Sequence, residues 1–361
     1  MCSEQRVMTL VKEAKLQEND NPAESAKKYL QAAQELLELS STHPERQQEY
    51  IDVANRMYLQ AKKLRSNSSE GMTISKPKKD ITFASIAGLE ELKEDIRFKI
   101  IEPLKHPELF QYYGKSIGGG TLMYGPPGCG KTLMAKATAN EAKATFIHVK
   151  SSDLKSKFVG ETEKNIAELF VQARKNQPSI IFFDEFEALG GDRTEGLSHE
   201  RSAVAQLLTE MDGVDTKDQQ ILLLAATNEP WTIDPALRRE GRFGTTIFIP
   251  PPDLAAREQI LSLQMQKRPT EKIEYIALAQ ATEGFSGADL KAVCEYATNL
   301  ALKESLLTGK KRKVTMEDME AAVTKTQSVL PQWFAKAQQQ VARKKLEGSF
   351  KELVESRLIM S

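Results

Sequence analysis

The sequence predicts an α/β protein, with a doubly wound parallel sheet at its centre, a helical subdomain after the sheet and a small three-helix bundle before it. Three observations lead to this prediction. A glycine-rich loop joins an apolar run to a helix-forming stretch, and further apolar runs alternate with helical stretches between residues 80 and 250. Before residue 65 and after residue 253 the apolar residues follow helical spacing instead.

Residues 1–65 are predicted to form three amphipathic helices, because their apolar side chains recur at helical spacing. The second helix has a clear start: Asn21 is a suitable N-cap, Pro22 suits the first helical position, and Glu24 can complete a capping box. Three short helices give a small core, so we expect a marginally stable bundle. The polar segment 66–79 that follows is predicted to be a flexible linker.

Residues 80–250 are predicted to form the large α/β subdomain, because strands and helices alternate there. Residues 251–327 are predicted to form a helical lid, and residues 328–361 a C-terminal helical tail. We expect Trp333 and Phe334 of the tail to pack against the lid or against a neighbouring subunit. The strands are predicted at Gly120–Tyr124, Thr145–Val149, Ile180–Phe183, Ile221–Ala226 and Thr245–Ile249.

The bulk composition excludes several classes of protein. The chain has 361 residues, enough for about two to three domains, and 50 Lys and Arg balance 50 Asp and Glu, so nucleic acid is not expected as a partner. No apolar run approaches the roughly 20 residues of a membrane span, and the polar N-terminus predicts no signal peptide. Cys2, Cys129 and Cys294 are too far apart for a disulfide framework or a metal site. These features predict a cytoplasmic protein.

The segment Gly125–Thr132 fits the phosphate-binding pattern G-x-x-x-x-G-K-[ST]. Its glycines let successive backbone N–H groups point at a phosphate, and the helix that follows directs its positive N-terminus there. Lys131 supplies a cation for the β- and γ-phosphates, and the Thr132 hydroxyl is an oxygen ligand for Mg²⁺. The alternative is a turn that binds no ligand. The loop residues are Gly125, Pro126, Pro127, Gly128, Cys129, Gly130, Lys131 and Thr132.

Two carboxylates follow the predicted strand Ile180–Phe183, at the edge where open parallel sheets bind ligands. Asp184 is expected to hold Mg²⁺ through its water shell, and Glu185 to act as the general base that polarises the attacking water. The alternative for this pair is an acidic N-cap of the next helix. Another strand ends at Asn228, whose amide can orient the water or touch the γ-phosphate; an ordinary turn residue is the alternative.

The segment Asp234–Phe243 carries several arginines. Phosphoryl transfer builds negative charge on the γ-phosphate, and an arginine delivered from a neighbouring chain can neutralise it. The alternative is that these arginines are solvated surface residues.

In these motifs and their order, residues 80–327 resemble a single AAA ATPase module of the AAA+ class, which has the P-loop NTPase fold. The resemblance implies that the ligands are ATP and Mg²⁺. The matching motifs are Ile86–Leu89, His106–Phe110, the phosphate-binding loop, Asp184-Glu185, Met211–Gly213, Ala226–Asn228, Asp234–Phe243 and Gly284–Leu290.

The resemblance also implies roles for single residues. Glu185 activates water, and Asn228 is the first sensor. Arg239 and Arg242 match the arginines that reach the nucleotide of the next subunit, which implies a ring, usually a homo-hexamer. The residues that flank the adenine are Ile86, Gly88, Gly287 and Ala288.

A first pore loop is matched by Lys157, Phe158 and Val159. An aromatic side chain in a central channel can grip a polypeptide without reading its sequence, and Lys157 adds charge. Without the resemblance, Phe158 is as well explained as an ordinary core residue. The polar, glycine-rich segment Gly190–His199 is expected to form the second pore loop.

Residues 1–65 resemble a microtubule-interacting-and-trafficking domain. The match is Ala26-x-x-Tyr29 in the second helix and Tyr58-Leu59-x-Ala61-x-x-Leu64 in the third. A tetratricopeptide-like hairpin fits almost as well, because both need small residues where two helices cross. Either one offers a groove for a partner helix or peptide. A capping bundle without a partner is the remaining alternative.

The order of helical domain, tether and one AAA module resembles the ESCRT-disassembly ATPase, with katanin and spastin as relatives. This resemblance implies an ATP-driven ring that pulls on a protein or filament client caught by residues 1–65, with any membrane recruitment indirect. The alternative is a general unfoldase of the valosin-containing type. A third reading is a nucleotide-switched scaffold with little turnover. Glu185 argues against it, since a pure switch has no need of a water-activating carboxylate.

Two positions depart from the family pattern. Gly244-Thr245 follow Gly-Arg-Phe where the family usually has Asp-Arg, which puts the local subunit contact in question. Cys129 stands where the family loop usually carries Thr. A thiol at a helix N-terminus beside a lysine is expected to be acidic and oxidisable, so one hypothesis is that oxidation of Cys129 blocks ATP binding. The alternative is a small residue that simply fits.

Overall fold

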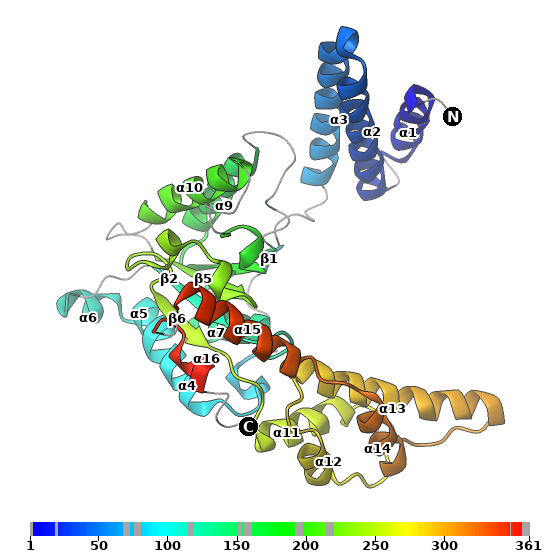
Figure 1. Ribbon diagram of the computed structural model, residues 1–361, viewed down its shortest axis with the longest axis vertical. Helices are drawn as coiled ribbons and strands as arrows, with labels where there is room; N and C mark the ends of the chain where they lie inside the picture. The colour runs from blue at the N-terminus through cyan, green and yellow to red at the C-terminus, as the bar shows by residue number, and fades with distance from the viewer. Residues whose placement is uncertain are drawn as a thin grey trace. The chain divides into compact units, whose positions relative to one another are not determined.

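The computed structural model describes residues 3–18, 21–67, 73–75, 81–114, 119–150, 154, 161–191, 198–213, 220–346 and 348–355. The chain divides into two compact units, Met1–Thr73 and Ile74–Ser361 (Figure 1). The division falls inside the segment 66–79 that the sequence predicts to be a linker. Each unit has hydrophobic clusters of its own, so each is described by itself.

The first unit is a helical bundle. Its described residues form α1 (Ser3–Gln17), α2 (Pro22–Thr42) and α3 (Gln47–Asn67), and α2 contacts both other helices. The predicted N-cap of α2 is confirmed, because Asn21 Oδ1 accepts a hydrogen bond of 3.2 Å from the backbone N–H of Glu24. The Glu24 carboxylate does not complete a capping box; it pairs with Lys27, one turn further along the helix, at 3.2 Å.

Small residues occupy one half of the core of this bundle. Ala14, Ala26 and Ala61 are fully buried beside Tyr29. The hydroxyl of the neighbouring Ser25 donates a hydrogen bond of 2.7 Å to the carbonyl of Ala14 and so joins α2 to α1. The helices cross closely here because alanine side chains end at Cβ.

The second unit is built on a sheet with the strand order β1-β3-β4-β5-β2-β6. The five strands from β3 to β6 in this order pair in parallel, which confirms the predicted fold class. Every strand predicted from the sequence is present, with its ends shifted by at most one residue. The strands are β1 (Thr73–Ser75), β2 (Gly120–Tyr124), β3 (Thr145–Lys150), β4 (Ser179–Asp184), β5 (Ile221–Thr227) and β6 (Thr245–Phe248).

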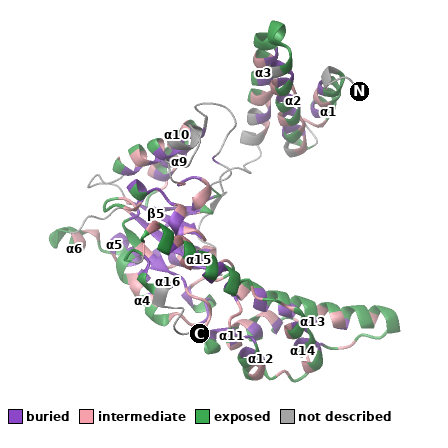
Figure 2. Ribbon diagram, viewed as in Figure 1, coloured by how far each residue is buried: buried purple, intermediate pink, exposed green. Residues whose placement is uncertain are grey.

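Side chains are buried on both faces of this sheet. The helices of the large subdomain are α4 (Glu90–Ile96), α5 (Glu102–Lys105), α6 (Pro107–Tyr112), α7 (Lys131–Ala142), α9 (Glu161–Lys175) and α10 (Ser198–Asp212), with a π-helical segment at Arg97–Ile101. Ile180 and Phe182 of β4 pack with Met134 of α7. Phe183, one residue along the strand, contacts Phe243 instead. All seven residues of β5 are buried, as expected of a strand covered on both faces (Figure 2).

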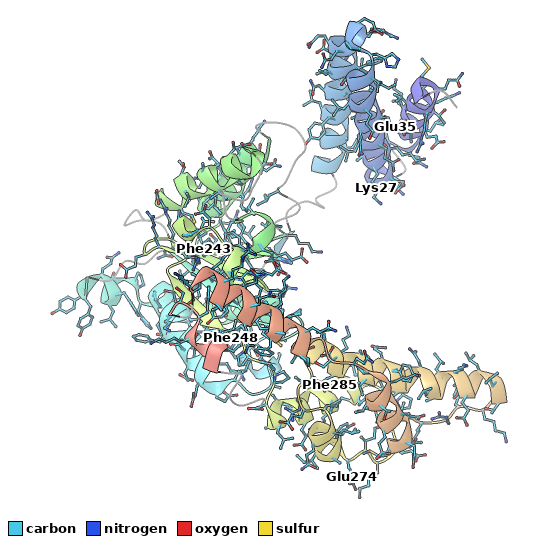
Figure 3. All side chains as sticks on the ribbon, in the orientation of Figure 1. Lys27, Glu35, Phe243, Phe248, Glu274 and Phe285 are labelled. Atoms are coloured by element: carbon cyan, nitrogen blue, oxygen red, sulfur yellow. The ribbon has the colours of Figure 1, made fainter. Side chains whose placement is uncertain are left out.

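The helical lid follows β6 and has a core of its own. It consists of α11 (Leu254–Met265), α12 (Tyr275–Ala281), α13 (Gly287–Thr308) and α14 (Met316–Lys325). Leu290 and Met319 are fully buried in its core, and Phe285 packs against it (Figure 3). A single isolated bridge, between Thr270 and Val314, interrupts this helical region. No helix in the described ranges has both the length and the hydropathy that crossing a membrane requires.

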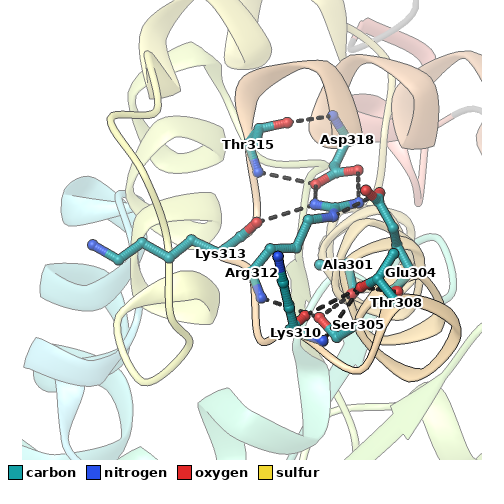
Figure 4. A network of polar contacts seen from close by, with 9 residues as sticks. All are labelled: Ala301, Glu304, Ser305, Thr308, Lys310, Arg312, Lys313, Thr315 and Asp318. Atoms are coloured by element: carbon teal, nitrogen blue, oxygen red, sulfur yellow. Dashed lines mark hydrogen bonds and ion pairs between the residues drawn. The ribbon is translucent and has the colours of Figure 1, made fainter.

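A polar network holds the turn between α13 and α14 (Figure 4). The Arg312 guanidinium donates to both carboxylate oxygens of Asp318, at 2.5 and 3.0 Å, and its Nε donates to Glu304 at 2.8 Å. Asp318 also accepts a hydrogen bond of 3.0 Å from the backbone N–H of Thr315, in the capping box of α14. One carboxylate therefore caps a helix and fixes the turn before it.

The C-terminal helices α15 (Leu330–Lys344) and α16 (Lys351–Glu355) return to the large subdomain. Trp333 and Phe334 join a buried cluster with Tyr124, Trp231 and Phe248. The expectation that these two residues pack against the lid or a neighbouring subunit is therefore wrong. The physical reason is that aromatic side chains at the ends of β2 and β6 form an apolar surface, which α15 covers.

Candidate functional site

The predicted phosphate-binding loop lies between β2 and the N-terminus of α7. At two positions of the loop, neighbouring atoms leave no room for a side chain, so only glycine fits. A Cβ at Gly125 would lie 2.3 Å from the carbonyl oxygen of Ile249, and one at Gly128 would lie 2.7 Å from the Cβ of Ala288. Both glycines also have positive φ, at 151° and 76°. Since the first backbone N–H groups of α7 have no partner within the helix, the loop ends in a group of donors suited to an anion.

Lys131 is folded back onto this loop. Its Nζ donates hydrogen bonds of 2.9 Å to the carbonyl of Gly125 and 2.8 Å to the carbonyl of Pro126. The side chain is buried, and this burial lowers the pKa of Lys131 to about 8. Burial disfavours the charged ammonium, which a bound phosphate would stabilise.

Thr132 and Asp184 meet at the head of α7. The Thr132 hydroxyl donates a hydrogen bond of 3.0 Å to Oδ2 of Asp184, and the backbone N–H of Glu185 donates to Oδ1 at 3.1 Å. Nε2 of His148 lies 3.4 Å from the same Oδ2. Burial by itself raises the pKa of Asp184, but His148, Thr132 and the backbone N–H outweigh it and hold the pKa below its usual value.

This donor set fits Mg²⁺. A hydroxyl oxygen and an ionised carboxylate oxygen are the hard ligands that the ion prefers, and Mg²⁺ commonly keeps its remaining positions for water and substrate phosphates. Among the described residues there is no group of three or more His, Cys, Asp or Glu side chains of the kind that forms an all-protein metal cage. The arrangement therefore suits a magnesium ion that arrives with a nucleotide.

Glu185 and Asn228 lie at the same edge of the sheet. Glu185 follows β4 with a left-handed backbone (φ 53°) and an exposed side chain, and Asn228 follows β5, the neighbouring parallel strand. The register that pairs Phe183 with Ala225 brings the two strand ends side by side. The carbonyl of Asn228 accepts a hydrogen bond of 2.9 Å from Trp333 Nε1, a contact that the sequence did not predict.

The predicted adenine-flanking residues come from both subdomains. In the lid, the backbone N–H of Ala288 donates a hydrogen bond of 3.1 Å to the carbonyl of Gly128, and a Cβ at Gly287 would lie 3.0 Å from the same oxygen. In the large subdomain, Ile86 is buried, and Gly88 faces the first turn of α11, with a built Cβ 3.1 Å from that of Ala256. The N-terminus of α13 therefore rests on the phosphate-binding loop.

The two predicted arginines differ in their surroundings. Arg242 donates from Nε and Nη2 to the two carboxylate oxygens of Asp212, each at 3.0 Å, and from Nη1 to the carbonyl of Ala236 at 3.0 Å. The Arg242 guanidinium holds the pKa of Asp212 below its usual value. Arg239 is exposed, and no residue in the described part of the chain forms an ion pair with it. The pore-loop residues Lys157, Phe158 and Val159 lie outside the described residues, as does most of the segment Gly190–His199.

The expectation of an acidic thiol at Cys129 is wrong. Burial raises the pKa of Cys129 to about 12, although the nearby Lys131 acts in the opposite direction. Cys129 packs against two hydrophobic clusters, and its Sγ lies 3.8 Å from the carbonyl oxygen of Pro127. Burial and the negative charge of the nearby Asp289 both disfavour a thiolate, and together they outweigh the positive charge of Lys131.

Sequence reasoning missed two residues at this site. His148 on β3 contacts Asp184 on β4. The pairing of His148 with Phe182, two residues before Asp184, places the two side chains near each other, and this pairing is known only once the strands are aligned. Trp333 contacts Asn228 although it lies 105 residues later in the sequence. No local pattern signals either contact.

Comparison with known proteins agrees with this geometry. Residues 121–251 match the model of the ATPase family associated with various cellular activities (AAA), and residues 272–321 match the AAA+ lid domain. A proteasome-activating nucleotidase of Saccharolobus solfataricus is 43% identical over 251 residues, which cover 68% of this chain and 62% of that protein. A proteasome-activating nucleotidase of Saccharolobus islandicus is 43% identical over 253 residues, covering 69% and 63%.

A cell division cycle protein 48 homolog of Archaeoglobus fulgidus is 42% identical over 264 residues, which cover 70% of this chain and 36% of that protein. The chain thus spans 62% or less of the length of these two relatives, the first nucleotidase and the cell division cycle homolog. The matched region contains the loop, both carboxylates, Asn228 and both arginines. The chain therefore carries an AAA domain followed by an AAA+ lid domain, the two parts of an AAA+ ATPase module.

Proposed function

We propose that this chain hydrolyses ATP at the loop Gly125–Thr132 and uses the reaction to remodel protein clients. The observation that carries the proposal is the 3.0 Å contact between Thr132 and Asp184, which places a hydroxyl and a carboxylate at the helix N-terminus that would face the phosphates. Glu185 lies next to this pair. The family match supports the same reaction.

Each side chain of the proposed site would have a separate role in binding or hydrolysis. Lys131 would leave its two loop carbonyls and turn to the β- and γ-phosphates, where its charge is compensated. Thr132 and Asp184 would hold Mg²⁺, which supplies charge neutralisation on the phosphates when bound. Glu185 would take the proton of the attacking water, and Asn228 would orient that water.

Arg239 and Arg242 would complete the site of a neighbouring copy. Both lie on the segment between η6 (Pro235–Arg238) and β6. An arginine supplied by another subunit stabilises the charge that develops on the γ-phosphate, so turnover would require assembly. We therefore propose a homo-hexameric ring, the assembly that the family resemblance implies.

The work of the ring would be mechanical. Lys157, Phe158 and Val159 would form a pore loop that grips client polypeptide, and residues 1–65 would recruit the client. The compact bundle of the first unit, with a core separate from that of the ATPase module, supports an independent recruiting domain. The proposal places the protein in the cytoplasm, with any membrane recruitment acting through the client.

We propose two classes of client between which the experiments below distinguish. The first is disassembly of an ESCRT-like filament, which the three-helix first unit favours if it acts as a microtubule-interacting-and-trafficking domain. The second is general unfolding of the valosin-containing type, which the similarity to the proteasome-activating nucleotidases of Saccharolobus favours.

Replacing Glu185 with Gln tests the hydrolysis. The variant should still bind ATP but lose turnover by about 10²-fold or more, because a positioned general base contributes 10²–10⁴-fold. Glu271→Gln, at an exposed carboxylate of the lid, is the matched control and should hydrolyse ATP normally. Normal turnover by Glu185→Gln would remove Glu185 from its role as base.

The same variant distinguishes the two client classes. In the presence of ATP, the full-length Glu185→Gln chain should retain its client, and the same chain without residues 1–65 should not. Retention of a purified filament-forming helical protein supports disassembly. Retention of a chemically denatured protein, independent of residues 1–65, supports general unfolding.

A further inference from the structure

The C-terminal segment 330–355 contacts the strands that carry the proposed ATP site, through residues that the proposed reaction does not use. Trp333 of α15 is 8% exposed and belongs to the cluster of Tyr124, Trp231 and Phe248. Tyr124 is the last residue of β2, directly before the phosphate-binding loop. Trp231 follows β5, three residues after Asn228. The segment therefore contacts both strands that carry the nucleotide site.

Three contacts attach α15 to the end of β5. The indole N–H of Trp333 donates a hydrogen bond of 2.9 Å to the backbone carbonyl of Asn228. Lys336, one turn further along the helix, forms an ion pair with Glu229. The rings of Trp333 and Trp231 lie 6.0 Å apart between centroids. Three of the four residues from 228 to 231 are thus held by one face of α15.

The same segment also holds the residue before the loop. The Tyr124 hydroxyl donates a hydrogen bond of 2.7 Å to Glu352 of α16. The Tyr124 ring also contacts Phe350, with centroids 5.0 Å apart. The C-terminal segment therefore joins the strand end before the loop to the strand end that carries Asn228.

At its start, α15 is tied to the lid. The Ser328 hydroxyl donates a hydrogen bond of 2.6 Å to the carbonyl of Gly284 and lies 3.3 Å from Oδ2 of Asp289. Asp289 closes the capping box of α13, and the backbone N–H of the preceding residue, Ala288, donates to the loop residue Gly128. An unbroken set of contacts therefore runs from the lid through α15 to Asn228.

We propose that Trp333 is a positioning residue for Asn228, through which the C-terminal helix sets the orientation of the amide expected to orient the attacking water. The inference rests on the proposed function of Asn228. The indole is suited to this task because it is a rigid side chain. The ring of Phe334 packs against it, with centroids 5.1 Å apart, and this packing fixes the direction in which the indole N–H points. The atom that Trp333 binds is the backbone carbonyl oxygen of Asn228. A shift of this oxygen also moves the side-chain amide of the same residue. Small misplacements of orienting groups lower rates strongly.

The test is Trp333→Phe in the full-length chain. A smaller aromatic ring remains and the donor is lost, so kcat for ATP should fall about tenfold with KM unchanged, the loss expected for one hydrogen bond that acts on the transition state. Asn228 is partly exposed, so water can satisfy its carbonyl and the fold should persist. Val341→Ala is the matched control: Val341 is a buried member of the same cluster two turns further along α15, its side chain forms no hydrogen bond or ring contact with Trp333, and the variant should keep kcat within about twofold.

A double variant distinguishes positioning from general support of the fold. Asn228→Ala alone should lower kcat, and adding Trp333→Phe should lower it no further, because the two residues act through one group. If Asn228→Ala leaves kcat unchanged, the proposed role of Asn228 fails. If Asn228→Ala lowers kcat but Trp333→Phe does not, only the present inference is overturned.

A second change keeps the test decisive if Trp333→Phe folds poorly. Site-specific replacement of Trp333 by its benzothiophene analogue keeps the shape of both rings and exchanges the N–H for sulfur. The same tenfold fall in kcat at constant KM supports the inference, and an unchanged kcat overturns it.

Discussion

Arg242 is bound by Asp212 of its own chain through two parallel hydrogen bonds of 3.0 Å, whereas Arg239, three residues earlier, is exposed. Sequence motifs treat the two arginines alike. The structure separates them. Arg239 has no ion-pair partner among the described residues, whereas Arg242 would have to leave, or act from within, a bidentate pair to serve a neighbouring chain.

We therefore predict different effects when each arginine is replaced by alanine. Arg239→Ala should lower turnover by roughly 10³-fold, the lower end for an arginine supplied in trans, and leave the melting temperature unchanged. Arg242→Ala should lower turnover and also lower the melting temperature by about 2–4 °C, since a partly exposed pair contributes about 1 kcal/mol. ATPase assays and thermal unfolding check both, with Arg239→Lys as a control for charge. Equal melting temperatures would show that the tether to Asp212 adds no stability.

The second prediction concerns Cys129. With its pKa raised to about 12, the fraction of thiolate at pH 8 is about one in 10⁴, so iodoacetamide should modify Cys129 at least about a hundredfold more slowly in the native chain than in urea. Mass spectrometry of the loop peptide measures this ratio. Peroxide treatment should likewise leave ATP hydrolysis unchanged. Rapid modification of the native chain would restore the hypothesis that this cysteine regulates the site.

The third prediction uses the small-residue crossing in the first unit. Ala26→Leu adds three carbon atoms where the side chain is fully buried, so it should destabilise the bundle by about 1–3 kcal/mol. ATP hydrolysis should stay unchanged, because the bundle and the ATPase module are separate compact units. Circular dichroism should show an earlier first thermal transition. Gln31→Leu, at an exposed position of the same helix, should leave that transition in place, and a matching loss of ATPase activity would contradict the independence of the units.

The fourth prediction is a pH dependence of the lid. The Arg312 guanidinium holds the pKa of Asp318 below its usual value, so the stabilisation from this carboxylate is present above its unfolded pKa of about 3.9 and is lost as the pH falls through the lowered folded pKa. Asp318→Asn should melt at a lower temperature than the parent chain at pH 7. The difference between the two melting temperatures should shrink below about pH 4. A difference that is constant with pH would mean that the charge of Asp318 is not what stabilises the α13–α14 turn.

Much of the nucleotide site was predictable because its signals are local. The glycines of the loop meet the steric demands of one turn, the apolar runs at β2, β4 and β5 are buried on both faces, and parallel strands bring Glu185 and Asn228 to one edge. Each of these consequences follows from backbone geometry within a few residues. The family resemblance added the roles of the arginines and of the pore loop, which remain predictions.

The sequence by itself determined the fold class, the order of the subdomains and the place of the phosphate-binding loop, because propensity, periodicity and steric demand act over short stretches of chain. Only the tertiary structure decided that Trp333 packs under Asn228, that Asp212 holds Arg242, and that Cys129 is a weakly acidic thiol. These properties depend on which distant groups surround a side chain and on how much water they exclude. Burial and partner choice are set by packing of the whole unit, and no local pattern encodes them.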